Sequence, residues 1–234
     1  ALRGIGVCRS EFSLDQEDFK TLSEDEANLQ CLMPYLGGED VNRSPTQSHE
    51  RYAINFTDRP LEFAEQFPAL LSIVRERVLP ERLKAKNHGP GKHGKKYWWQ
   101  HTLRRDPLFT AIGPLKRCLV AAITTSHLSF SFQPIRQAFT HTLVVFAFED
   151  YGHFACLQSQ VHGIWARLFS STLEDRLRYS IKDVFQTFAF PQNDMLSEHT
   201  AKIGDEYYGH RSQYMSGNDC GFTATDNRLH DPLQ

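Results

Sequence analysis

The chain has 234 residues, of which 40% are hydrophobic and 23% are charged, and its formal net charge is −2. This composition is typical of a globular protein with one large or two small domains and a sizeable core. No apolar run approaches the roughly 20 residues of a membrane span, and the first residues lack the apolar stretch of a signal peptide. The five cysteines contain no C-x-x-C pair, which predicts reduced thiols in a cytoplasmic protein and no zinc site.

The charge is unevenly distributed along the chain. Between Arg75 and Arg105 there are ten basic and two acidic residues, a net charge of +8. The remainder of the chain therefore carries −10. One basic segment in an otherwise acidic protein indicates a surface that faces a polyanion, although a basic segment that is merely solvated gives the same pattern.

The sequence pattern of the N-terminal third predicts helices, turns and one strand. A capping box at Ser13 to Gln16 predicts a short helix through Leu22. Residues 36–45 are dense in turn formers, and the alternating residues 51–56 predict a strand. A helical segment follows from about residue 58, with an apolar face through Val78, and Pro80 is expected to end it.

Residues 89–96 read GPGKHGKK, one residue away from the phosphate-binding loop G-x-x-x-x-G-K-[ST] of nucleotide hydrolases. That loop requires a buried strand before it and a helix after it. Here charged residues precede the segment, Tyr97, Trp98 and Trp99 follow it, and Lys96 replaces the Ser or Thr that would hold magnesium. We therefore expect a flexible basic loop for another kind of phosphate. Of the two tryptophans, we expect one in the core and one facing a groove.

The remaining residues predict a block of strands between helices. A short helix is expected over 106–112, and strands over 118–123, 128–132 and 142–148, with a turn at 133–136. A long amphipathic helix is expected over 151–169, with an inward face of Leu157, Val161, Ile164, Trp165 and Leu168. A last helix over 197–215 and an irregular tail over 223–234 complete an α+β order.

Patterns that would indicate catalysis are missing from the sequence. There is no H-E-x-x-H pair, no G-x-S-x-G nucleophile and no glycine-rich cofactor loop of a methyltransferase. The acidic pair Glu39–Asp40 lies in a predicted turn, without the lysine spacing of a restriction-type nuclease. What remains is a set of basic residues interleaved with aromatic residues and turn-rich loops, which favours nucleic-acid binding.

Five segments, taken in order, resemble one family. They are PYLGGEDVNRSPTQSHERYAINF (34–56), LPERLK leading to YWW (79–99), LQSQVHGIWARLFSSTLEDRLRYS (157–180), FQTFAFP (185–191) and GFTATDNRLHDP (221–232). Together they are similar to the target recognition domain that follows the methyltransferase domain in combined type II restriction–modification polypeptides, the MmeI-like and related adenine-N6 DNA methyltransferases.

The resemblance implies a division of labour within a larger assembly. A separate domain of the same polypeptide or a separate subunit would bind S-adenosylmethionine and methylate a flipped adenine, while this chain would bind double-stranded DNA and hold no cofactor or metal. The implied fold is a small twisted mixed sheet with flanking helices and a long supporting helix. We expect the recognition domain over residues 1–195, and a C-terminal helix and tail leading out of it over 196–234.

Motif residues such as Gly37, Gly38, Gln158 and Trp165 are expected to hold the scaffold, so base-reading residues are sought in loops. Arginine pairs best with guanine, and asparagine or glutamine with adenine. The expected base contacts are Asn42, Arg43, Thr125, His127, Gln133 and Arg136. The expected phosphate contacts are Lys84, Lys86, Lys92, Lys95 and Lys96.

Three readings remain open from the sequence. The chain is either a sequence-specific DNA recognition module without catalytic activity of its own, or a scaffold that docks a separate methyltransferase or nuclease subunit. An autonomous nuclease or nucleotide-using enzyme built around residues 89–96 is the third reading. Salt-dependent DNA binding distinguishes the first from the others.

Overall fold

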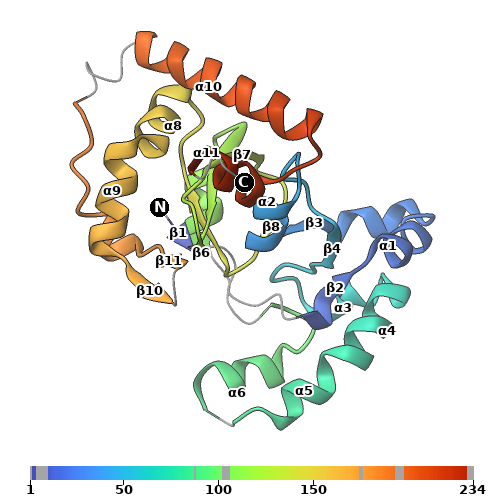
Figure 1. Cartoon of the computed structure of the whole chain (residues 1–234). Helices are drawn as coiled ribbons and strands as arrows, with labels where there is room; N and C mark the ends of the chain where they lie inside the picture. The colour runs from blue at the N-terminus through green and yellow to red at the C-terminus, as the bar shows by residue number, and fades with distance from the viewer. Residues whose placement is uncertain are drawn as a thin grey trace.

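The computed structural model describes residues 2–3, 10–86, 88–101, 106–173, 176–192 and 198–230. Helices surround three small sheets, so the predicted α+β class is confirmed, with three sheets in place of one (Figure 1). Within these ranges no helix combines the length and the apolar character that a membrane crossing requires.

The first sheet is antiparallel and has the order β1-β9-β5-β7. Its strands are β1 (Leu2–Arg3), β5 (Arg117–Ala122), β7 (Ser131–Pro134) and β9 (Leu143–Phe146). Successive residues of β5 enter different cores, since Leu119 and Ala121 pack on one side and Cys118 and Val120 on the other. Both faces of this sheet are therefore covered, which explains the unbroken apolar runs of β5 and β9.

The strand expected over 128–132 is displaced. Strand β7 starts at Ser131 and includes Gln133 and Pro134, which the sequence assigned to a turn. Pro134 is tolerated because it is the last residue of an edge strand, where a missing backbone donor costs little.

The other two sheets are built from shorter strands. One has the order β2-β4-β3-β8 and is mixed, since only β3 and β8 run parallel. Its strands are β2 (Ser13–Leu14), β3 (Leu32–Leu36), β4 (Arg51–Ile54) and β8 (Ala138–Phe139). The other has the order β10-β11-β6, with β6 (Thr124–Thr125), β10 (Ser171–Leu173) and β11 (Arg176–Arg178). The predicted strand over 51–56 is confirmed as β4.

The helix expected through Leu22 is confirmed, but two other N-terminal expectations are wrong, the cap at Ser13 and the turn over 36–45. Helix α1 (Gln16–Leu22) is capped by Asp15, whose carboxylate accepts a hydrogen bond from the backbone N–H of Asp18, while Ser13 lies in β2. The predicted turn over 36–45 contains helix α2 (Gly38–Arg43). Its turn-forming residues instead begin and cap this helix. A 3₁₀ turn (Glu26–Gln30) lies between α1 and β3.

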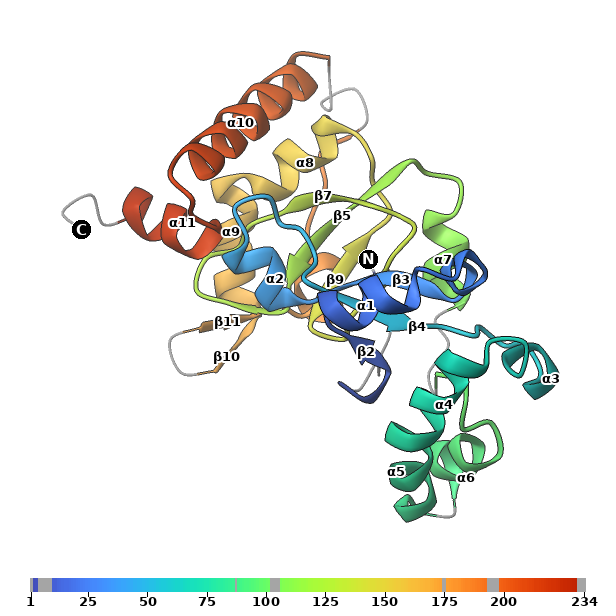
Figure 2. The same cartoon turned by 90° about the vertical axis from the view of Figure 1, so that its right-hand side faces the viewer.

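A helical lobe follows β4 and projects from the body at the end opposite α10 (Figure 2). It comprises α3 (Leu61–Ala64), α4 (Pro68–Arg77), α5 (Leu79–Lys84) and α6 (Gly89–Lys96), and α7 (Asp106–Ile112) comes next. The expected apolar face is buried, with Leu70 and Val74 fully covered. Pro80 does not end the helical segment; it lies in the first turn of α5, where the helix needs no donor from it.

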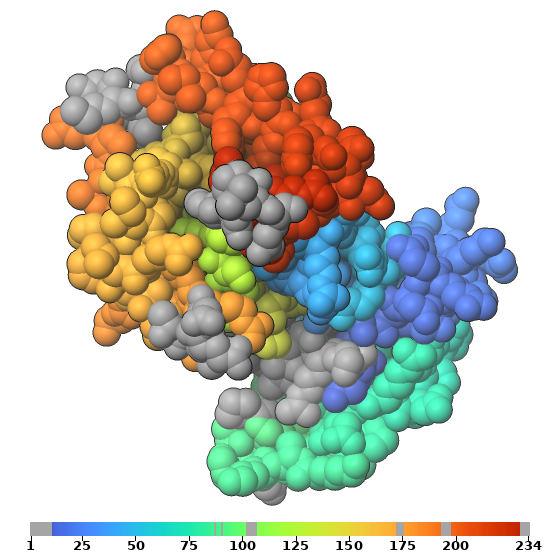
Figure 3. Space-filling model, viewed as in Figure 1, coloured from blue at the N-terminus to red at the C-terminus, as the bar shows by residue number. Residues whose placement is uncertain are grey.

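The expected flexible loop over 89–96 is wrong, because these residues form α6. Two of its glycines permit close packing. A side chain at Gly91 would overlap the backbone carbonyl of Lys86, and one at Gly94 would press on the guanidinium of Arg82. The lobe shows as a separate projection in teal and green (Figure 3).

The expected long helix over 151–169 is broken at Ser159 into α8 (Tyr151–Gln158) and α9 (Gln160–Phe169). Ser159 has an extended backbone, and its hydroxyl caps α9 by accepting from the N–H of His162. The break rotates the inward face. His162 and Ala166 are fully buried, whereas three residues expected inside are exposed, namely Val161 (69%), Ile164 (54%) and Leu168 (71%).

Helices also fill the C-terminal region. Helix α10 (Glu198–Gly217) confirms the helix expected over 197–215, although it is not the last one, and it packs along α8. The expected irregular tail is wrong over its described part, because α11 (Phe222–His230) begins there and packs on α2. Met215 and Phe222 are buried in the same core as Val41 of α2. The division at residue 195 stays a prediction.

Candidate nucleic-acid interface

Asn42 and Arg43 lie in the last turn of α2, whose start is fixed from both sides. The carboxylate of Asp40 accepts from the N–H of Gly37 at 2.6 Å, and the hydroxyl of Thr142 accepts from the N–H of Gly38 at 2.9 Å. Arg43 forms an ion pair with Glu39 at 2.6 Å in which both side chains are largely exposed, 79% and 67%. Exposed pairs of this kind contribute about 0–1 kcal/mol, so the Arg43 guanidinium can exchange Glu39 for a stronger partner.

Thr125 and His127 are connected to α2 by hydrogen bonds. The amide of Asn42 donates to the Thr125 hydroxyl at 3.5 Å, and that hydroxyl donates to the carbonyl of His127 at 2.6 Å. Thr125 itself is 5% exposed. The structure therefore brings together three of the expected base contacts, although Asn42 and Thr125 are 83 residues apart in sequence.

Gln133 and Arg136 differ in their placement. Gln133 is buried, and its amide donates to the carbonyl of Gln47 at 3.0 Å and to the hydroxyl of Ser131 at 3.1 Å. Its side-chain oxygen accepts from Gln137 at 3.1 Å. The side chain of Gln133 is therefore engaged in an interior hydrogen-bond network, and we leave Gln133 out of the residues proposed to contact DNA. Arg136 is exposed in the turn after β7.

Strand β11 brings two exposed arginines beside this group, which the sequence reasoning missed. Leu177 pairs with Thr125 and is buried, while Arg178 pairs with Thr124 and points outward with Arg176. The alternation of Arg176, Leu177 and Arg178 is a short strand signal, and its placement next to β6 could not be read without the fold.

The expected phosphate contacts lie on and between α5 and α6. Lys86, Lys92 and Lys96 are exposed, and Lys95 is half-buried. The Lys84 ammonium, 72% exposed, pairs with Glu81 at 2.7 Å. The lobe thus presents its positive charges on an outer surface.

The two tryptophans follow the expected division in part. Trp99 is buried, and its ring N–H donates to the carbonyl of Arg59 at 2.9 Å, so the expected core role of one tryptophan is confirmed. Trp98 is half-buried, with the Arg75 guanidinium 5.7 Å from its ring centroid.

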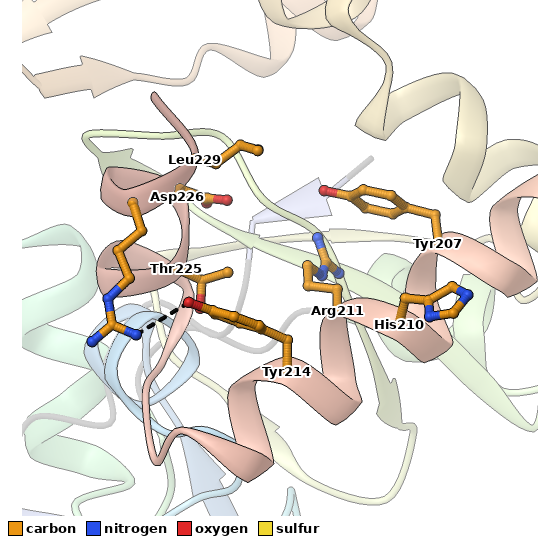
Figure 4. A pocket seen from close by; sticks show the side chains of 8 residues that line it. Tyr207, His210, Arg211, Tyr214, Thr225, Asp226 and Leu229 are labelled. Atoms are coloured by element: carbon orange, nitrogen blue, oxygen red, sulfur yellow. Dashed lines mark hydrogen bonds between the residues drawn. The ribbon is translucent and has the colours of Figure 1, made fainter. Parts of the chain in front are cut away.

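A hollow of about 360 Å³ lies between α10 and α11 (Figure 4). Tyr207 and Tyr214 form its walls, and the buried residues Arg211 and Asp226 form its inner side. Burial lowers the pKa of the Arg211 guanidinium, which donates to the carbonyl of Phe130 at 2.6 Å and to Gln158 at 2.9 Å. A second hollow of about 370 Å³ adjoins it and reaches His127.

The described residues show no arrangement suited to metal or cysteine chemistry. No group of three or more His, Cys, Asp or Glu side chains among them is placed to hold a metal ion. The four described cysteines are free and buried. Burial raises the pKa of Cys31 to about 11 and that of Cys118 to about 12, so both remain thiols and are poor nucleophiles. Cys8 lies outside the described residues.

The chain is similar to a known protein family and to a solved structure. The family model described as MmeI, target recognition domain, matches residues 7–192. A solved structure titled as the type IIL restriction–modification enzyme MmeI in complex with DNA is similar in fold, with a TM-score of 0.66 and 17% sequence identity. The similarity covers 82% of this chain and 24% of that chain, so this chain corresponds to about a quarter of the enzyme's length. No curated protein matches. Because the family model covers most of its residues, the chain belongs to the MmeI target recognition domain family.

Proposed function

We propose that this chain selects the double-stranded DNA target of a restriction–modification adenine-N6 methyltransferase and performs no chemistry by itself. The match to the target recognition family over residues 7–192 carries the proposal. The geometry supports it, because expected base contacts from distant parts of the sequence meet at α2 and β6.

The proposed base-reading surface consists of side chains that project from short, well-anchored elements. Arg43 and Arg136 present guanidinium groups, which pair with the major-groove edge of guanine. Asn42 supplies an amide next to Arg43, and Arg178 joins them from β11, which pairs with β6. Thr125 is buried and bonds to Asn42 and to the carbonyl of His127, so these two residues hold the group in place.

The proposed backbone-binding surface is the outer side of α5 and α6. Lysines neutralise phosphates as point charges and need no fixed orientation to do so. Lys84, Lys86, Lys92, Lys95 and Lys96 would anchor the duplex without reading its sequence.

Methyl transfer is assigned to a separate methyltransferase domain of the same polypeptide or a separate subunit. That domain would hold S-adenosylmethionine and the flipped adenine. We further propose that the protein acts in the cytoplasm, where its free cysteines stay reduced.

The proposal is tested by titrating the 234-residue chain with mixed duplexes at two salt concentrations. Binding should weaken as salt rises, because lysines release counterions from the phosphates. Lys96→Ala should weaken binding, whereas Lys202→Ala removes the same charge from α10 and should leave it unchanged. No binding at low salt, or equal effects of the two substitutions, would contradict the proposal. Metal-dependent cleavage or ATP hydrolysis by the pure chain would instead favour an enzyme.

One observation supports the second candidate, a protein-docking scaffold. Val161, Ile164 and Leu168 form an exposed apolar row on α9, and such rows mark contacts with other proteins. Ile164 lines the same hollow as His127, whereas Val161 does not line it, so Val161 is the residue to substitute. Val161→Asp should leave duplex binding unchanged and weaken association with a methyltransferase or nuclease subunit, which co-purification would measure.

A further inference from the structure

Helix α11 lies beyond the residues that the family model matches, yet it contacts the elements that carry the proposed base contacts. Figure 2 shows it beside α2. The sequence placed this segment in a tail that leads out of the domain. Its described residues form a helix that packs on α2.

The first contact joins the start of α11 to the end of α2. Gly221 precedes α11, and a side chain there would overlap the backbone of Arg43 and the carbonyl oxygen of Asn42. These are backbone atoms, so α2 could accommodate a side chain only by shifting. Phe222 then packs in the same core as Val41 of α2. The presence of glycine at 221 therefore lets α11 rest directly against the residues proposed to read bases.

The second contact joins the middle of α11 to the segment that follows β6. The buried carboxylate of Asp226 accepts a hydrogen bond from the Ser129 hydroxyl at 2.6 Å. One residue later, the side-chain oxygen of Asn227 lies 2.9 Å from Nε2 of His127. This contact engages Nε2 of an imidazole whose Nδ1 is buried, so it fixes the position of His127 and of its carbonyl, which holds Thr125.

These contacts form a closed network that joins α2, residues 125–127 and α11. Asn42 bonds to Thr125, Thr125 bonds to the carbonyl of His127, and His127 bonds to Asn227. Helix α11 then returns through Gly221 to the backbone of α2.

This closed network is anchored on the body of the molecule through α10. The Arg211 guanidinium lies 4.5 Å from the ring centroid of Phe222 and donates to the carbonyl of Phe130. Gln158 accepts from the same guanidinium and from the N–H of Phe130. The anchor thus connects α11 to the segment that enters β7.

We propose that α11 is a positioning element of the DNA-reading surface, so that target specificity requires Gly221 and Asn227, which lie beyond the family-matched region. This inference rests on the proposed function. Asn227 acts through His127, whose carbonyl holds Thr125 and through it Asn42. Gly221 acts by seating α11 on α2. A base-reading side chain gains discrimination only when its donors are held in place before binding.

The test measures specificity separately from affinity. The preferred duplex is first selected from a randomised pool with the wild-type chain, and its dissociation constant is then compared with that of a scrambled duplex. Asn227→Ala should reduce this ratio by about fivefold, the effect of one hydrogen bond, and leave binding to the scrambled duplex unchanged. Gly221→Ala should reduce the ratio at least as much. The matched control is Asn218→Ala, since the exposed Asn218 amide donates to the carbonyl of Tyr214, four residues earlier in the chain; it should leave the ratio unchanged.

A double variant identifies the route of the effect. If Asn227 acts through His127, then Asn227→Ala combined with His127→Ala should discriminate no worse than His127→Ala alone. Additive losses would overturn the assigned route, and an unchanged ratio in Asn227→Ala would overturn the inference even if Gly221→Ala failed to fold. A wild-type chain that binds duplexes without any preference would overturn the proposed function itself. A wild-type preference that both variants keep would overturn only the role of α11.

Discussion

The two regions proposed to contact DNA are built in opposite ways. Around α2 and residues 124–129, side chains are held by hydrogen bonds to partners far away in sequence, such as Asn42 to Thr125 and His127 to Asn227. On α5 and α6 the lysines are mostly exposed, and the ion pair of Lys84 is to Glu81, three residues away. One region is integrated into the interior, and the other is a charged surface on a projecting lobe.

The difference matches what each kind of contact requires. A base edge presents donors and acceptors at fixed positions, so the side chain that reads it must be held in place before binding. A phosphate accepts a cation from many directions, so a mobile ammonium on an exposed helix is sufficient. Changes near the first region should therefore alter stability and specificity, and changes in the second should alter affinity and its dependence on salt.

The largest effect is expected for Arg211→Met, which tests how deeply the integrated region depends on the C-terminal helices. The substitution removes the guanidinium donor of the Phe130 carbonyl and one of the two donors of the Gln158 side-chain oxygen. We expect the free energy of unfolding in urea to fall by about 3–4 kcal/mol. Arg228→Met is the control, because Arg228 is exposed and bonds to the Tyr214 hydroxyl; a change of at most about 0.5 kcal/mol is expected there. Equal effects of the two substitutions would show that α10 is not integrated.

Acid should destabilise the core next to the integrated region through His162 of α9, whose ring contacts Phe130. Burial lowers the pKa of this histidine from 6.5 to about 4 in the folded chain, and its ring bonds to the carbonyl of Leu157 and the hydroxyl of Tyr179. The unfolded chain takes up the proton first, so the contribution is complete above pH 6.5 and is lost as the pH falls to about 4. We expect a loss of about 3 kcal/mol across this window.

The measurement for this effect is the free energy of unfolding of the wild type and of His162→Gln at several pH values. The wild type should lose stability more steeply between pH 6.5 and 4, by up to about 1.4 kcal/mol per pH unit. Parallel curves would mean that His162 does not titrate differently in the two states.

Arg43→Ala should separate specificity from stability within the integrated region. The exposed pair with Glu39 contributes little to folding, so the free energy of unfolding should stay within about 0.5 kcal/mol of the wild type. If Arg43 reads a guanine, the preferred duplex should lose about 1–3 kcal/mol of binding free energy, and discrimination at one base pair should relax. Arg51→Ala is an unsuitable control because Arg51 contacts Asp40; Arg59→Ala, which removes an exposed arginine just before α3, serves instead. A uniform loss over all duplexes would assign Arg43 to the phosphates.

The sequence predicted the regular elements with strong local signals. The apolar runs of β5 and β9 and the one-sided face of α4 define strands and a helix without reference to the rest of the chain. The same reasoning failed where tertiary contacts decide. Residues 36–45 have the composition of a turn, but hydrogen bonds from Asp40 and Thr142 stabilise the start of α2 there. Residues 89–96 have the composition of a flexible loop, but Gly91 and Gly94 pack closely against neighbouring residues.

The candidate site was predictable in its residue types and not in its geometry. Arginine, asparagine and lysine at turn-rich positions follow from the chemistry of bases and phosphates. The burial of Gln133 and the meeting of Asn42 with Thr125 depend on register and on contacts over long sequence separations. The broken helix at Ser159 is a similar case. Its apolar periodicity continues through the break, so the outward rotation of Val161 and Leu168 could not be read from spacing alone.

The smallest effect on the fold is expected for Lys84→Ala, and it tests the other side of the comparison. The Lys84–Glu81 pair is exposed, so its loss should change the free energy of unfolding by less than about 0.5 kcal/mol. If Lys84 contacts a phosphate, the slope of log affinity against log salt should become shallower by about 1, equally for preferred and scrambled duplexes. An unchanged slope would remove Lys84 from the backbone-binding surface. A loss confined to the preferred duplex would mean that the lobe also reads sequence, and the contrast between an integrated reading region and a sequence-blind charged lobe would no longer hold.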